Sequence, residues 1–165
     1  MPPSQAVTTQ RGDHAPGPST SAFPTPDALA VWRDFLRAHA LLVRRLEADL
    51  VAEHALPLAS YDVLVQLVEA TDHRLRMTEL AERVLLSRSG LTRLVDRLAR
   101  EGLVRREACP SDARGLYAVL TDEGYDRLRR ATPTHLRGVE RYAVGRLDAA
   151  ELASLHEVLK RFLDE

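Results

Sequence analysis

The sequence predicts a mainly α-helical fold that carries one small β-hairpin. Apolar residues recur at helical spacing through most of the chain between residues 27 and 163, and this spacing changes to a strand pattern only between residues 103 and 120. Residues 1–26 are rich in Pro, Ser, Thr and Gly and hold few apolar side chains, so they are predicted to be a disordered tail. A length of 165 residues fits one domain besides that tail.

The bulk composition excludes several classes of protein. No apolar run approaches the roughly 18 residues that a membrane span needs, and the start of the chain has no apolar signal core. Cys109 is the only cysteine, so no intramolecular disulfide can form. We therefore expect a cytoplasmic protein without a membrane partner.

The first predicted helix is unusually long. Thr25 can cap it, Pro26 suits its first position, and it is expected to run to about His54. A helix of this length spans about 42 Å. Its apolar stripe is broader than the remaining chain can cover, which favours packing against a second subunit. The stripe consists of Leu29, Trp32, Leu36, Val43, Leu46 and Leu50.

Three more helices are predicted before the hairpin. Residues 58–70 are apolar almost all round and so form a buried helix. After a polar turn and a very short extended piece (72–76), residues 77–86 form a helix that Thr78 caps. Its predicted apolar face is Leu80, Ala81, Val84 and Leu85.

Ser87 is predicted to cap the next short helix, and Gly102 is suited to end it in left-handed geometry. The buried stripe of this helix is expected to be Leu91, Leu94, Val95 and Leu98.

A hairpin and two helices complete the predicted fold. The hairpin has strands at 103–108 and 116–120, joined by a turn at 109–115. Thr121 is predicted to cap a helix over 122–146 that Pro133 kinks. Asp148 and Glu151 form a variant of the capping box and open a last helix over 148–163.

Two short helices, a tight turn and a two-stranded ribbon make a winged helix–turn–helix, in which the second helix enters the major groove of DNA. Six arginines and two acids give residues 87–106 a local charge of +4, although the whole chain carries −1. The side of this helix opposite its apolar stripe is the candidate DNA-binding face. It presents Arg88, Ser89, Thr92, Arg93, Arg97 and Arg100.

Other interpretations of this pattern stay open. Arginines on the outer face of a helix often only keep it solvated, and a winged helix can also serve as a protein-interaction module. The N-terminal tail, which holds Arg11, is an alternative flexible arm for DNA. The sequence shows no Gly-rich phosphate loop, nucleophile motif or cluster with metal-ligand spacing, so we expect no enzyme activity, cofactor or metal.

The chain resembles the MarR family of dimeric bacterial transcription regulators over residues 27–163. The matching motifs are Leu80-Ala81, "LTRLVDRL" at 91–98, "EGLV" at 101–104, "DARG" at 112–115 and "LTDEG" at 120–124. The resemblance implies a DNA-binding core at about 58–121. It also implies an intertwined homodimer through the N- and C-terminal helices, at about 27–54 and 122–163.

The resemblance further implies that the dimer binds a palindromic DNA operator. Arg114 is then expected to contact DNA or brace the wing, with Asp112 and Gly115 ordering the wing. We expect a repressor of a nearby operon that a small, aromatic or phenolic ligand releases. An activator remains an alternative, as does a redox sensor acting through Cys109.

Four residues are candidates for the ligand pocket. Trp32 and Arg37 have a spacing seen in a urate-responsive branch of the family, and His39 lies on the apolar seam of the first helix. Tyr61 and Asp62 begin the helix that borders the family's pocket. Core packing is the alternative role for His39 and Tyr61, and local capping for Asp62.

Overall fold

The computed structural model describes residues 23–109 and 112–163, and of residues 112–114 the backbone only. Most of the predicted tail therefore lies outside the described residues. The chain divides after Leu36 into an N-terminal part and a larger part that begins at Arg37. No helix among the residues described is both long and apolar enough to cross a membrane.

The N-terminal part contains the first turns of α1 (Pro26–His54). The predicted cap is confirmed, because the Thr25 Oγ1 atom accepts a hydrogen bond from the Ala28 N–H at 3.2 Å. Trp32 stacks on Phe35 with 6.0 Å between ring centroids. Both rings remain about half exposed, as do the neighbouring apolar side chains.

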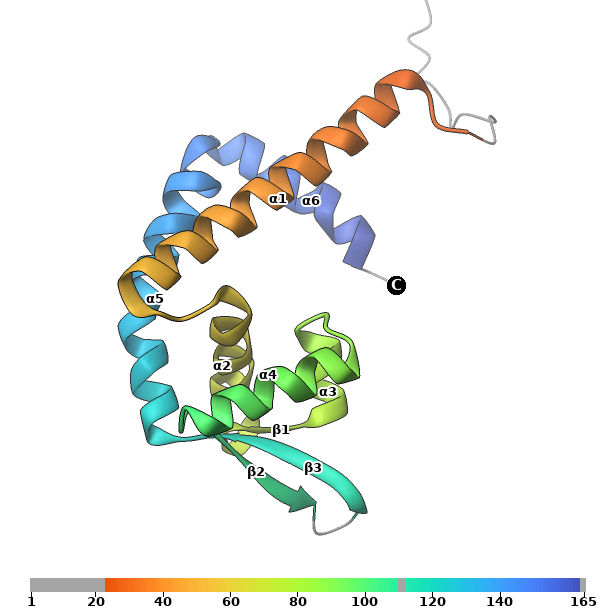
Figure 1. Cartoon of the computed structure of the whole chain (residues 1–165). Helices are drawn as coiled ribbons and strands as arrows, with labels where there is room; N and C mark the ends of the chain where they lie inside the picture. The colour runs from red at the N-terminus through yellow and green to blue at the C-terminus, as the bar shows by residue number, and fades with distance from the viewer. Residues whose placement is uncertain (1–22, 110–111, 164–165) are drawn as a thin grey trace, which may run out of the picture. The chain divides into compact units, whose positions relative to one another are not determined.

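The larger part contains the predicted winged helix–turn–helix (Figure 1). Its helices and strands, in order, are α2 (Leu58–Glu69), η1 (Thr71–His73), β1 (Arg74–Arg76), α3 (Met77–Arg83), α4 (Arg88–Arg100), β2 (Val104–Cys109) and β3 (Asp112–Leu120). The strands form an antiparallel sheet in the order β1-β3-β2. The β2–β3 hairpin, or wing, extends beyond the three helices.

The predicted boundaries of α4 are confirmed. The Ser87 Oγ atom accepts a hydrogen bond from the Gly90 N–H at 3.1 Å, and the helix ends before Gly102, which has a φ of +74°. The predicted stripe of α4 joins the core. That core includes Leu50, Leu56, Val63, Leu64, Leu67, Leu80, Leu91, Leu94, Val95, Leu98, Ala118 and Leu128.

Two predictions about α3 are wrong. Thr78 is not the cap, because the extended β1 leads directly into a helix that already begins at Met77, and no side chain caps it. Leu85 is not on the buried face, since α3 ends at Arg83 and the chain turns through a φ of +54° at Leu85. That backbone turn leaves the Leu85 side chain 92% exposed.

The sheet also differs from the prediction. The short extended piece is a third strand, in which Leu75 pairs with Ala118 and Arg76 with Tyr117. Strand β3 begins at Asp112, four residues earlier than expected, because its backbone already pairs with Cys109 across the hairpin.

Helix α5 (Asp122–Tyr142) leads away from the sheet. Thr121 caps it as predicted, since its Oγ1 atom accepts a hydrogen bond from the Gly124 N–H at 3.0 Å. The helix continues through Pro133 but ends before the predicted residue 146, where the short helix η2 (Val144–Arg146) takes over.

The predicted capping box opens α6 (Ala149–Leu163). The Asp148 Oδ1 atom accepts a hydrogen bond from the Glu151 N–H at 2.9 Å, and the Glu151 carboxylate accepts one from the Asp148 N–H at 2.9 Å. None of the residues of α6 is buried.

A polar network joins the end of α1 to α5. The buried Thr134 hydroxyl donates to Glu53 Oε2 at 2.7 Å and lies 2.8 Å from His54 Nε2. Arg137 donates to the same Glu53 oxygen at 3.0 Å, and Arg127 donates to the His54 carbonyl at 2.7 Å. The hydrogen bond from Thr134, the largest effect, and the nearby cations lower the pKa of Glu53.

Candidate nucleic-acid interface

The outer face of α4 carries cations that have no partner among the described residues. Leu91, Leu94, Val95 and Leu98 hold the opposite face of the helix in the core. Arg88, Arg93 and Arg100 are exposed, and their guanidinium groups make no hydrogen bond or ion pair with any residue that the structure describes. Such side chains are available for an anionic partner, as the sequence predicts.

Two smaller predicted residues lie at the start of the same face. Ser89 is exposed, with its Oγ atom 3.4 Å from the capping Ser87 hydroxyl. Thr92 is also exposed, and its hydroxyl donates to the Arg88 carbonyl at 2.9 Å. The first turn of α4 contains no acidic residue, so the positive end of the helix dipole is not neutralised locally.

Arg97 differs from the other predicted arginines. Its Nη2 atom donates to the Oγ atom of Ser60 on α2 at 2.8 Å, and its Nε atom lies 3.9 Å from Glu101. Ser60 is 1% exposed, so this arginine is attached to the interior of the protein.

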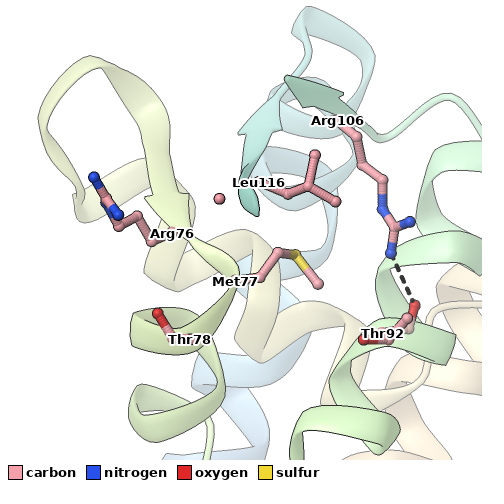
Figure 2. A pocket seen from close by; sticks show the side chains of 7 residues that line it. Arg76, Met77, Thr78, Thr92, Arg106 and Leu116 are labelled. Carbon is pink, nitrogen blue, oxygen red and sulfur yellow. Dashed lines mark hydrogen bonds between the residues drawn. The ribbon is translucent and has the colours of Figure 1, made fainter. Parts of the chain in front are cut away.

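The wing is tied to α4 by an ion pair that sequence analysis missed. Arg106 of β2 lies 2.9 Å from the Asp96 carboxylate, and it also donates to the Thr92 carbonyl at 3.5 Å. Figure 2 shows the Arg106 side chain reaching down to Thr92. Strand alternation over 103–108 could have indicated that Arg106 leaves the sheet on the opposite side from Arg105.

A hollow of about 260 Å³ lies between α4, the start of α3 and the wing. Its walls combine polar and apolar side chains (Figure 2). The hollow is lined by Arg76, Met77, Thr78, Thr92, Arg106, Gly115 and Leu116. Of the predicted wing residues, Gly115 lines this hollow. The side chains of Asp112 and Arg114 lie outside the described residues, so their predicted roles stay predictions.

Arg76 and Thr78 also line this hollow, and no sequence pattern predicted either of them here. They lie beside the wing because β1 pairs with β3. Arg76 and its partner Tyr117 are 41 residues apart in the sequence, so no local sequence pattern could have predicted this pairing. The guanidinium group of Arg76 lies 5.7 Å from the Tyr117 ring centroid and donates to the sulfur of the buried Cys109 at 3.2 Å.

The ligand-pocket candidates occupy different environments. Trp32, in the N-terminal part, is 54% exposed, and His39 is exposed. Tyr61 is buried, stacks on His135 with 4.4 Å between centroids, and donates to Thr132 at 3.5 Å. Burial lowers the pKa of His135.

Asp62 points away from that core. It lines a hollow of about 190 Å³ between α2 and the end of α3, together with Arg83. Packing by its neighbours raises the pKa of Asp62, although the side chain keeps an exposed face, and the negative charge of Glu47 adds to this effect.

A further hollow, which sequence analysis missed, lies between α2 and α5. Its volume is about 320 Å³, and its walls are mostly apolar. It is lined by Val68, Tyr125, Leu128, Arg129, Thr132 and Pro133. Over the described part of the chain, no group of three His, Cys, Asp or Glu side chains could hold a metal ion.

The fold and its cationic face define a winged helix–turn–helix protein. Comparison with known proteins gives the family. A MarR family model matches residues 55–115, and the chain is 40% identical to Sco3205, a MarR family transcriptional regulator from Streptomyces coelicolor solved in complex with DNA. That likeness has a TM-score of 0.82 and covers 87% of this chain and 91% of Sco3205. The chain belongs to the MarR family of transcriptional regulators.

Two other relatives are informative. The HTH-type transcriptional repressor YetL of Bacillus subtilis is 41% identical over 75 residues, which are 46% of this chain and 45% of YetL. The chain therefore matches less than half the length of that repressor. PcaV of Streptomyces coelicolor, solved in complex with its natural ligand, is 32% identical with a TM-score of 0.64, over 84% of this chain and 92% of PcaV. These relatives are regulators rather than enzymes.

Proposed function

We propose that this chain binds double-stranded DNA through α4 and the wing and thereby regulates transcription. The observation that carries the proposal is the exposed face of α4, where Arg88, Arg93 and Arg100 have no described partner. Arginine can bind a guanine edge through two hydrogen bonds or a phosphate through its charge. The relative Sco3205, crystallised with DNA, supports the same use of this fold.

The DNA-binding form is a homodimer. Helix α6 has no buried residue, yet one side of it presents Leu155, Val158, Leu159 and Phe162. An apolar stripe of this kind is stable in water only against a partner surface. Two copies related by a twofold axis place two α4 helices on successive major grooves, about 34–36 Å apart, which matches a palindromic operator.

The regulator acts as a repressor that a small aromatic anion releases. Similarity to the repressor YetL supports repression over activation, and the ligand-bound structure of PcaV supports regulation by a small molecule. The hollow between α2 and α5 suits an aromatic ligand, because its walls are mostly apolar and include a phenol, Tyr125. Arg129 at the same hollow lies 3.6 Å from the Asp126 carboxylate, so an anionic ligand would have to compete with that ion pair. A ligand there acts only through the difference in its affinity for the DNA-competent and DNA-incompetent dimers.

The test uses a duplex that the wild-type protein selects from a random pool. Arg93→Ala and Arg114→Ala are expected to weaken binding to this duplex about 5- to 100-fold in a gel-shift titration, without loss of the folded dimer. Wild-type affinity in either variant would refute the assignment of that residue. Failure to bind any duplex at low salt would instead favour a protein-interaction module.

A further inference from the structure

The first turn of α2 is a junction between helices. The Leu58 N–H donates to the carboxylate of Glu47 on α1, which replaces the side-chain cap that Pro57 cannot supply. Two residues later, the Ser60 hydroxyl accepts the hydrogen bond from Arg97 of α4. The scaffold helix α1 and the DNA-facing helix α4 are thus both bonded to one turn of α2.

The hydrogen bond between Arg97 and Ser60 has a buried acceptor, the Ser60 hydroxyl. The Ser60 side chain is 1% exposed, and Arg97 is its side-chain hydrogen-bond partner among the described residues. A buried hydroxyl without a partner is costly, so the bond favours one position of α4 against α2. Glu101, the residue just after α4, lies 3.9 Å from the Arg97 Nε atom on the other side of the same guanidinium group.

The position of Arg97 on the helix agrees with an inward role. An α-helix turns by about 100° per residue. On this geometry Arg93 lies about 150° from the centre of the buried stripe, whereas Arg97 lies about 110° from it, on the side of Leu94. The side chain of Arg97 therefore starts nearer the buried face than that of Arg93, and its hydrogen bond to Ser60 brings it to α2.

We infer that Arg97 is a positioning residue, which fixes the angle of α4 through Ser60 and does not itself contact DNA. This inference rests on the proposed DNA-binding function. Base contacts depend on the helix orientation, whereas attraction to phosphates depends mainly on charge. Loss of the Ser60–Arg97 bond therefore reduces binding to a specific sequence more than binding to an arbitrary one.

The experiment measures affinity for the selected duplex and for a scrambled duplex of equal length, each over a range of salt concentrations. The variants are Ser60→Ala, Arg97→Ala and the double variant, with Arg100→Ala as the matched control from the exposed face. Ser60→Ala and Arg97→Ala should each weaken binding to the selected duplex about tenfold. The double variant should lose no more than Arg97→Ala alone.

The salt dependence separates positioning from phosphate contact. For a positioning residue, the slope of log affinity against log salt stays that of the wild type, and binding to the scrambled duplex changes less than about twofold, because no phosphate contact is lost. Arg100→Ala removes a cation that has no partner among the described residues, and it should reduce the slope by about 0.9 if Arg100 contacts a phosphate.

Two results would overturn the inference. One is wild-type affinity in Ser60→Ala, and the other is a slope reduced by about 0.9 in Arg97→Ala, which marks a phosphate contact. Circular dichroism below the melting temperature checks that each variant is folded. If Arg97→Ala does not fold, Ser60→Ala alone still tests the inference. If the wild-type protein selects no duplex at all, the proposed function fails instead of the inference about Arg97.

Discussion

Three arginines of α4 and three of α5 have the same charge but different surroundings. On α5, the guanidinium groups of Arg127, Arg130 and Arg137 contact the His54 carbonyl, Glu123 and Glu53. On α4, those of Arg88, Arg93 and Arg100 contact none of the described residues.

The difference shows that the formal charge of a segment does not identify a binding face. A cation that already has a carboxylate partner offers little net charge to DNA. A cation without one retains its full attraction for phosphates. Substitutions near α5 should therefore change the stability of the fold, and substitutions on α4 should change DNA affinity.

The largest expected effect is on stability, at the start of α5. A Cβ atom at Gly124 would lie 2.0 Å from the Leu103 carbonyl oxygen, a backbone atom that cannot easily move. Gly124→Ala should lower the free energy of unfolding by about 3 kcal/mol, measured by urea denaturation at fixed protein concentration. Gly90→Ala is the control in α4, because its Cβ meets only the Ser87 hydroxyl at 3.1 Å. A change in Gly124→Ala no larger than in Gly90→Ala would contradict the close packing at α5.

A smaller effect is expected where α5 meets α1. Thr134→Val keeps the shape of the side chain but removes the hydroxyl that bonds Glu53 and lies against His54. We expect a loss of about 1–2 kcal/mol in stability and no change in DNA affinity. The matched variant on α4, Thr92→Val, should change stability by less than about 0.5 kcal/mol. If fully folded Thr134→Val protein bound DNA more weakly than the wild type, the proposed separation between α5 (stability) and α4 (DNA binding) would be contradicted.

The smallest effect concerns acid sensitivity at α5. Burial lowers the pKa of His135 in the folded protein, so this histidine resists protonation there and binds protons more readily when unfolded. Its contribution to stability is therefore complete above the ordinary histidine pKa of ~6.5 and is lost as the pH falls below that value. His135→Phe retains a ring against Tyr61 and should flatten the loss of stability between about pH 6.5 and 5. An unchanged pH profile would show that His135 does not titrate in this range.

Much of the fold follows from local sequence. The caps at Thr25, Ser87, Thr121 and Asp148 were predictable because each needs only a side-chain oxygen two or three residues before a backbone N–H. The stripe of α4 follows from its spacing in the same way. The third strand and the early start of β3 were not predictable, because they depend on pairing between distant segments.

The candidate interface shows the same limit. The outward position of Arg93 follows from helical spacing alone. The inward attachment of Arg97 does not, since it depends on Ser60, which is 37 residues away in the sequence. The helical pattern predicts that Leu85 lies in the core because it continues through this residue, but the backbone turns into the left-handed region there. Contacts between elements decide which members of a periodic pattern are free.

The most direct test of the difference between α4 and α5 is the salt dependence of DNA binding in Arg93→Ala and Arg137→Ala. Both variants remove one exposed arginine, but only Arg137 has a described carboxylate partner, Glu53 at 3.0 Å. The slope of log affinity against log salt should be steep in the wild type, about 0.9 smaller in Arg93→Ala if Arg93 contacts a phosphate, and unchanged in Arg137→Ala. A flat slope in the wild type, or an equal reduction in both variants, would contradict the assignment of DNA binding to α4.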